Sequence, residues 1–141
     1  MGIASLTRRV HFAAAHRYRR PEWSDAKNEE MFGLCARPEY HGHTYACDVT
    51  VSGPIDEATG MVLDLRLLDL VLSAEVVERF DHRNLNTDVP EFAEGKQIPT
   101  CENVARLIAG RVQFVLGTRA RVTEVMVAES PTLCATWRST G

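Results

Sequence analysis

The sequence has little that would indicate a membrane, secreted or nucleic-acid-binding protein. No apolar run approaches the roughly 20 residues that a membrane-spanning helix needs. The N-terminus lacks the apolar core and small-residue cleavage pattern of a secretory signal, so we expect a cytoplasmic protein. The 16 basic and 19 acidic side chains give a formal charge of −3, which offers no long-range attraction to nucleic acid or to an anionic membrane. We therefore expect a small-molecule partner.

Cysteine is also scarce, and its four positions are far apart in the chain. This pattern is typical of reduced thiols rather than of a disulfide framework. We expect Cys47, Cys101 and Cys134 to be small apolar fillers, which leaves Cys35 as the candidate for a chemical role. With 141 residues and 45% hydrophobic content, the chain is long enough for one domain, residues 1–141, with a proper core.

Histidines concentrate between residues 16 and 43, where His41 and His43 flank a single glycine. In a β-strand, residues i and i+2 point to the same face, so both imidazoles can reach one metal ion. His16 is the candidate third ligand. Three histidines around zinc leave the fourth position open for water or substrate, as in catalytic sites. The sequence therefore predicts a catalytic zinc site at these three residues, with the Cys35 thiol close to it in the chain.

Alternation of apolar and polar residues predicts four strands, at residues 6–16, 43–51, 122–129 and 133–137, the last two joined by a turn at Ser130-Pro131. Between the first two strands, residues 18–40 form a long polar loop that we expect to hold a short helix at residues 24–31. Loops of this length in a compact domain usually serve function.

Helical spacing predicts two longer helices between the strand pairs. The first covers residues 64–80 with Asp64 as its N-cap, and the second begins at Thr100 and ends at Gly117. Their expected buried stripes are Leu65, Leu68, Leu72, Val76 and Phe80, and Val104, Leu107, Ile108, Val112 and Val115.

This order predicts an α+β fold in which a four-stranded antiparallel sheet carries two helices on one face. The other face and the outer strands would need cover. We therefore expect subunits to associate edge to edge into a closed multi-subunit β-barrel.

Six motifs in order along the chain resemble the 6-pyruvoyl-tetrahydropterin synthase family, which includes the 6-carboxytetrahydropterin synthases. They are Phe12-Ala13-Ala14-Ala15-His16, Met31-Phe32-Gly33-Leu34-Cys35, His41-Gly42-His43-Thr44-Tyr45, Asp81-His82-Arg83, Pro99-Thr100-Cys101-Glu102-Asn103 and Glu129. The resemblance implies the tunnelling fold, with subunits that form barrels and usually homohexamers built from two trimers.

The resemblance also implies roles for individual residues. His16, His41 and His43 would bind Zn²⁺, and Cys35 would be the catalytic thiol. Asp81 and His82, supplied by a neighbouring subunit, would complete a proton relay. Glu129 would bind the pterin ring, because a carboxylate can accept two parallel hydrogen bonds from its amino group and ring nitrogen. The implied substrate is 7,8-dihydroneopterin triphosphate, which loses triphosphate and shifts hydrogens internally to give 6-pyruvoyl-tetrahydropterin.

Alternatives remain at this stage. Cys35 could be a fourth ligand that closes a structural zinc site, and Asp81 with His82 could merely cap the first helix. The five residues between Cys35 and His41 favour the 6-pyruvoyl product, whereas many 6-carboxytetrahydropterin synthases have a shorter gap. The 6-carboxy reaction is the alternative activity, and a non-catalytic zinc-stabilised binding protein is the alternative class. Tyr40, where the family often has glycine, and Ser130-Pro131 depart from the common pattern.

Overall fold

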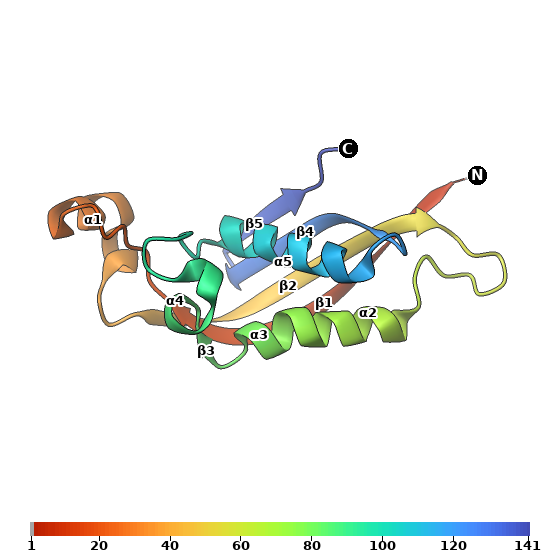
Figure 1. Cartoon of the computed structure of the whole chain (residues 1–141), viewed down its shortest axis with the longest axis horizontal. Coiled ribbons are helices and arrows are strands. Elements are labelled where there is room, and N and C mark those ends of the chain that lie inside the picture. Colours follow the sequence, from red (N-terminus) through yellow and green to blue (C-terminus); the bar gives the residue numbers. More distant parts are fainter. Residues whose placement is uncertain (1) are drawn as a thin grey trace.

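The computed structural model describes residues 2–141, which form an α+β fold built on one five-stranded sheet (Figure 1). Its strands are β1 (Ile3–His16), β2 (His41–Pro54), β3 (Arg83–Asn84), β4 (Arg121–Ser130) and β5 (Leu133–Arg138). They lie in the order β3-β1-β2-β4-β5. The prediction of a four-stranded antiparallel sheet was therefore wrong in two respects. The sheet has a fifth strand, β3, and it is mixed because β3 pairs with β1 in parallel. A two-residue strand is too short to produce an alternation signal.

The β1–β2 hairpin fixes the positions of the site residues. Its register places Phe12 opposite Tyr45 and His16 opposite His41. On β2, Tyr45 and the apolar residues that follow at every second position are fully buried, as the period of a strand requires. The three histidines therefore lie at one end of the hairpin, on the face that also carries the core.

The helix predicted at residues 64–80 forms as three continuous segments, α2 (Leu65–Leu72), a π-helical turn η2 (Ser73–Val77) and α3 (Glu78–Phe80). The Asp64 side chain accepts a hydrogen bond from the backbone N–H of Arg66 at 2.9 Å, which is its expected capping role. The predicted stripe is buried from Leu68 to Phe80, but Leu65 is 39% exposed because it lies in the first turn, beyond the core.

Helix α5 (Cys101–Leu116) begins and ends as predicted. The Thr100 hydroxyl accepts a hydrogen bond from the backbone N–H of Asn103 at 3.1 Å, and Gly117 ends the helix with a left-handed φ of 61°. Its central apolar residues pack into the core, whereas Val115 is 40% exposed, contrary to expectation. The buried stripe instead continues from Val112 to Leu116, four residues on and fully buried, which turns Val115 toward solvent.

Helices α2, α3 and α5 cover one face of the sheet, which confirms the predicted layer order (Figure 1). The other face is polar along β1 and β2, where Ser5 and Ser52 share a hydrogen bond at 2.7 Å and Arg9 donates to Asp48 at 2.6 Å. Cys47 and Cys101 are buried as expected, but Cys134 is exposed on β5 and fills no part of the core.

The loop between β1 and β2 contains α1 (Asp25–Phe32) and a 3-10 turn, η1 (Gly33–Ala36), close to the predicted short helix. Ser24 caps α1. The buried side chain of Asn28 accepts a hydrogen bond from the backbone N–H of Arg20 and donates one to the carbonyl oxygen of the same residue. Two further short segments, α4 (Leu85–Asp88) and a 3-10 turn, η3 (Pro90–Phe92), connect β3 to α5. Among residues 2–141, no helix is both long and apolar enough to cross a bilayer.

Candidate functional site

The imidazoles of His16, His41 and His43 converge at the end of the β1–β2 hairpin. His41 and His43 share a face of β2, and His16 lies opposite His41 on β1. The ring centroids are 4.6 to 5.1 Å apart, and one nitrogen from each ring lies within 4.8 Å of the other two. The structure thus brings together the three side chains that the sequence singled out as zinc ligands.

His16 is the most constrained of the three, because it is fully buried and hydrogen-bonded. Its Nδ1 lies 2.8 Å from the carbonyl oxygen of Pro99. A carbonyl can only accept, so Nδ1 carries the hydrogen and Nε2 keeps its lone pair. Burial lowers the pKa of His16 to about 4, and burial also lowers the pKa of His41. Both imidazole rings are therefore neutral near pH 7, and each has a nitrogen lone pair that can bind a metal ion.

Glu129 reaches this cluster from the end of β4. The register between β4 and β5 shifts between Ala128 and Ser130, and such bulges re-aim side chains beside functional sites. Oε2 of Glu129 lies 3.7 Å from Nε2 of His16 and 3.6 Å from Nε2 of His43. These distances are too long for hydrogen bonds, so the carboxylate faces two imidazoles without bonding to either.

The chemistry of this cluster fits a divalent cation. Oε2 of Glu129 and Nε2 of His43 are both buried and have no hydrogen-bond partner among the described residues. Orphaned buried polar atoms are rare in folded proteins and call for an explanation such as an ion. Neutral imidazole is a preferred ligand of zinc, whose tetrahedral ligands lie about 3.4 Å apart. The three nitrogens, now within 4.8 Å of one another, would reach that spacing by a movement of side-chain size.

Cys35 lies on η1, half-buried at the rim of this region. Its backbone carbonyl accepts a hydrogen bond from the N–H of Tyr18 at 2.7 Å, which ties the loop to the end of β1. Burial, followed by the negative charge of Glu129, raises the pKa of the Cys35 thiol. Within one chain, burial and the charge of Glu129 therefore favour the protonated thiol of Cys35 over the thiolate.

Asp81 and His82 follow α3 and form the expected pair, with Nδ1 of His82 3.0 Å from Oδ2 of Asp81. The other oxygen of Asp81 accepts a hydrogen bond from the N–H of Ala13 at 2.8 Å, which is the main cause that lowers the pKa of Asp81. His82 has a left-handed φ of 58°, a conformation that costs a non-glycine residue about 1–2 kcal/mol. Backbone strain held in place this way often marks a functional position.

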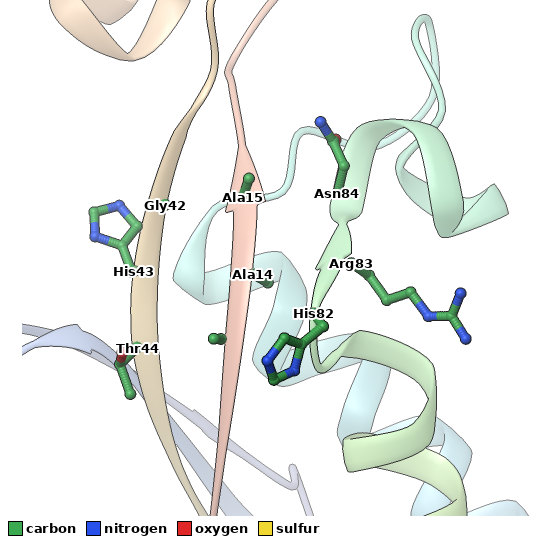
Figure 2. A pocket seen from close by; sticks show the side chains of 9 residues that line it. Ala14, Ala15, Gly42, His43, Thr44, His82, Arg83 and Asn84 are labelled. Carbon is green, nitrogen blue, oxygen red and sulfur yellow. The ribbon is translucent and has the colours of Figure 1, made fainter.

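The His82 side chain lies beside β3 and β1, whereas the cluster lies at the end of the β1–β2 hairpin. It is 85% exposed and lines a hollow with Ala13, Ala15, Gly42 and Thr44, and His43 of the cluster borders the same hollow. Figure 2 shows His82 and His43 on opposite flanks of β1 and β2. One chain therefore does not bring this pair to its own three histidines.

The structure adds three residues to the site that the sequence did not single out. Cys101 touches Glu129 from the first turn of α5, and burial raises its pKa to about 12. Tyr45 contacts His16 through its hydroxyl, and the Pro99 carbonyl binds the same ring. Tyr45 could have been found, because it lies two residues after His43 on the same strand face. No local sequence signal reports the other two contacts.

Known proteins match nearly the whole chain. Residues 5–140 match the family described as 6-pyruvoyl tetrahydropterin synthase. A relative named 6-pyruvoyl tetrahydrobiopterin synthase from Drosophila melanogaster is 41% identical over 129 residues, which are 92% of this chain and 76% of that protein. The human protein of the same name is 43% identical over 113 residues, 80% of this chain and 77% of its own length.

A solved structure and a bacterial relative extend this result. The structure of 6-pyruvoyl tetrahydropterin synthase from Caenorhabditis elegans superposes with a TM-score of 0.92 at 34% identity, covering 99% of this chain and 98% of that one. A 6-carboxy-5,6,7,8-tetrahydropterin synthase from Bacillus subtilis is 30% identical over 138 residues, 94% of this chain and 84% of the relative. The chain belongs to the 6-pyruvoyl tetrahydropterin synthase family.

Proposed function

We propose that this chain is a zinc-dependent lyase that converts 7,8-dihydroneopterin triphosphate to 6-pyruvoyl-tetrahydropterin. Triphosphate is eliminated and hydrogens move within the substrate, so no nicotinamide is consumed. The observation that carries the proposal is the convergence of His16, His41 and His43 beside the buried carboxylate of Glu129. The names of the relatives at 41% and 43% identity support the same reaction.

The three histidines would hold Zn²⁺ through neutral nitrogens, and His16 has its Nε2 lone pair free for this role. When bound, zinc would supply a Lewis acid that polarises substrate hydroxyls and acidifies the neighbouring carbon-bound hydrogens. Glu129 would accept hydrogen bonds from the pterin amino group and ring nitrogen. Its Oε2 is buried, has no hydrogen-bond partner among residues 2–141, and so is available to accept.

Cys35 would remove a carbon-bound proton from the substrate, as a thiolate. Asp81 would orient His82 as its proton partner, in the way that a carboxylate fixes the tautomer of a histidine base. The 3.0 Å contact of Asp81 with His82 supports that role. Because burial and Glu129 raise the pKa of Cys35 in one chain, the thiolate would depend on a cation brought close to it.

Assembly would supply the relay pair from a neighbouring subunit. Two features support this: His82 is exposed and lies across β1 and β2 from His43 (Figure 2), and the open sheet ends in short edge strands, β3 and β5. Edges of this kind can pair between subunits and close a barrel. We propose the homohexamer of two trimers that the family resemblance implies.

The direct test is to incubate purified, zinc-loaded protein with 7,8-dihydroneopterin triphosphate and to identify the product by mass. We expect 6-pyruvoyl-tetrahydropterin and free triphosphate. A 6-carboxy product would instead establish the alternative activity, which the Bacillus subtilis relative favours. A protein that binds zinc and substrate without turnover would establish a non-catalytic binding protein. As a matched control, Cys134→Ala removes an exposed thiol on the outer strand β5 and should leave the product unchanged.

A further inference from the structure

Tyr40 has a left-handed backbone, with a φ of 62°, directly before the proposed zinc ligand His41 and five positions after Cys35. This conformation is unfavourable for tyrosine, because its Cβ lies too close to the following carbonyl oxygen. Glycine would adopt it without that cost. A tyrosine kept in a strained conformation beside a functional site points to a contact that its ring makes.

The ring contacts Arg17, which directly follows the proposed ligand His16. The guanidinium carbon lies 5.1 Å from the centroid of the Tyr40 ring, within the range of a cation–π interaction. One guanidinium nitrogen also lies 3.8 Å from the carboxylate of Glu94. The Arg17 side chain is only 19% exposed, and partial burial strengthens both interactions. Arg17 therefore connects the residue before β2 with the loop between η3 and α5.

The backbone of Arg17 is also fixed, by the side chain of Asn86 on α4. The N–H of Arg17 donates to Oδ1 of Asn86 at 2.8 Å, and the carbonyl oxygen of Arg17 accepts a hydrogen bond from Nδ2 of Asn86 at 3.0 Å. The guanidinium therefore extends from an anchored main chain. An anchored partner loses less conformational entropy in the contact than a mobile one, so the Tyr40 ring gains more from it.

The segment of residues 33–40, here called the Cys35 segment, is attached to the end of β1 at two points. The carbonyl oxygen of Cys35 accepts a hydrogen bond from the N–H of Tyr18 at 2.7 Å. At the other end of the segment, the N–H of Tyr40 donates to the carbonyl oxygen of Arg37 at 3.3 Å, which closes a turn directly after η1. The contact between Arg17 and Tyr40 is the second attachment, and it holds this turn beside β1.

We infer that Arg17 and Tyr40 are positioning residues for the proposed catalytic thiol: their stacked side chains hold the Cys35 segment against the strand end that carries His16. The inference rests on the proposed function, in which the thiol meets a substrate bound at the three histidines. A displacement of about 1 Å at a reacting group can lower turnover about 10²-fold. Without the contact, one of the two attachments is lost, and the segment should open more often.

The test compares Tyr40→Asn with Tyr40→Phe in the full chain. Asparagine adopts a left-handed φ readily, so the first variant relieves the backbone but removes the ring, whereas phenylalanine keeps both the strain and the ring. The readout is hydrogen exchange of the Tyr18 N–H, which requires its bond to the Cys35 carbonyl to open. Loss of a partly buried cation–π contact should accelerate this exchange about tenfold in Tyr40→Asn. Tyr40→Phe should exchange at the rate of the wild type.

The same variants separate positioning from general destabilisation. In Tyr40→Asn, kcat should fall about tenfold or more, while Tm and zinc affinity are not lowered, because the strain is relieved and the three histidines are unchanged. Arg20→Met is the control for loss of an arginine from this loop, since the Arg20 side chain pairs with Glu22 and with the carbonyl oxygen of Lys96 instead. It should leave the exchange of the Tyr18 N–H unchanged.

Arg17→Met removes the other partner and should accelerate the exchange of the Tyr18 N–H by a similar factor, after correction for the changed neighbouring residue. Because the two side chains act through one contact, the double variant should exchange no faster than either single variant. Independent effects would instead multiply to about a hundredfold. That result, or wild-type exchange in Tyr40→Asn, would overturn the inference. Failure of the wild type to convert the substrate would overturn the proposed function instead, and the exchange rates would still show whether Arg17 and Tyr40 hold the Cys35 segment.

Discussion

Replacing Glu129 by glutamine should stabilise the metal-free protein and weaken its response to zinc. Oε2 of Glu129 is buried, has no hydrogen-bond partner within residues 2–141, and lies 3.6 and 3.7 Å from two imidazole nitrogens. An unsatisfied buried group of this kind costs about 1–3 kcal/mol. Glutamine keeps the shape, removes the charge and offers an N–H to the orphaned Nε2 of His43.

The expected gain for chelator-treated protein is about 1–2 kcal/mol in the free energy of unfolding, or about 3–8 °C in Tm for a chain of this size. The rise in Tm on adding zinc should follow the opposite order. Because the carboxylate attracts the cation, zinc should raise the Tm of the wild type by more than that of Glu129→Gln. Thermal scans with and without zinc, at one fixed protein concentration, measure both differences.

Glu124→Gln is the matched control, because Glu124 lies on the same strand and pairs with Arg138 at 2.8 Å on the surface. Loss of an exposed pair should lower stability by about 0–1 kcal/mol, equally with and without zinc. The reasoning is refuted if chelated Glu129→Gln is no more stable than the wild type, or if zinc stabilises both proteins by the same amount.

Three further predictions concern the thiol, the helix cap and pH. Cys35→Ala should lower turnover by about 10²-fold or more. Its zinc affinity, measured by competition, should stay within about twofold of the wild type. Normal turnover would remove the thiol from the mechanism. Thr100→Ala should lower the stability of the protein by about 1 kcal/mol in urea unfolding, since the cap of α5 is lost. An unchanged midpoint would show that this cap is not needed.

The pH prediction concerns metal-free protein. Burial lowers the pKa of His16 from 6.5 to about 4, so between these values the unfolded chain binds more protons than the folded one. The contribution of His16 to the free energy of unfolding should be fully present above about pH 6.5. It should fall by up to about 3 kcal/mol as the pH drops toward 4. His16→Gln should flatten this part of the urea-unfolding profile; a profile as steep as that of the wild type would assign the dependence elsewhere.

Sequence periodicity was sufficient for the hairpin and the cluster because both depend on short-range rules. A period of two places His41 and His43 on one face, and the strand ending at His16 needs only antiparallel pairing to bring the third ring alongside. Helix caps at Asp64 and Thr100 are equally local, since each hydroxyl or carboxylate bonds within three residues.

Contacts between distant segments could not be read in the same way. The Pro99 carbonyl reaches His16 across 83 positions, and a backbone atom leaves no signature in residue type. The orientation of His82 depends on how α3 packs beside β1, which the motif does not encode. The backbone of Tyr40 was not predictable from the sequence either. Its left-handed φ of 62° explains why glycine would suit that position. Tyrosine adopts this conformation with the Arg17 guanidinium 5.1 Å from the centroid of its ring.

The most direct test of the account is anomalous diffraction at the zinc absorption edge from crystals grown with Zn²⁺. The account predicts one strong peak at about 2.0–2.1 Å from nitrogens of His16, His41 and His43, with a fourth position open to solvent. A peak ligated by Cys35, or no peak within reach of the three rings, would contradict it.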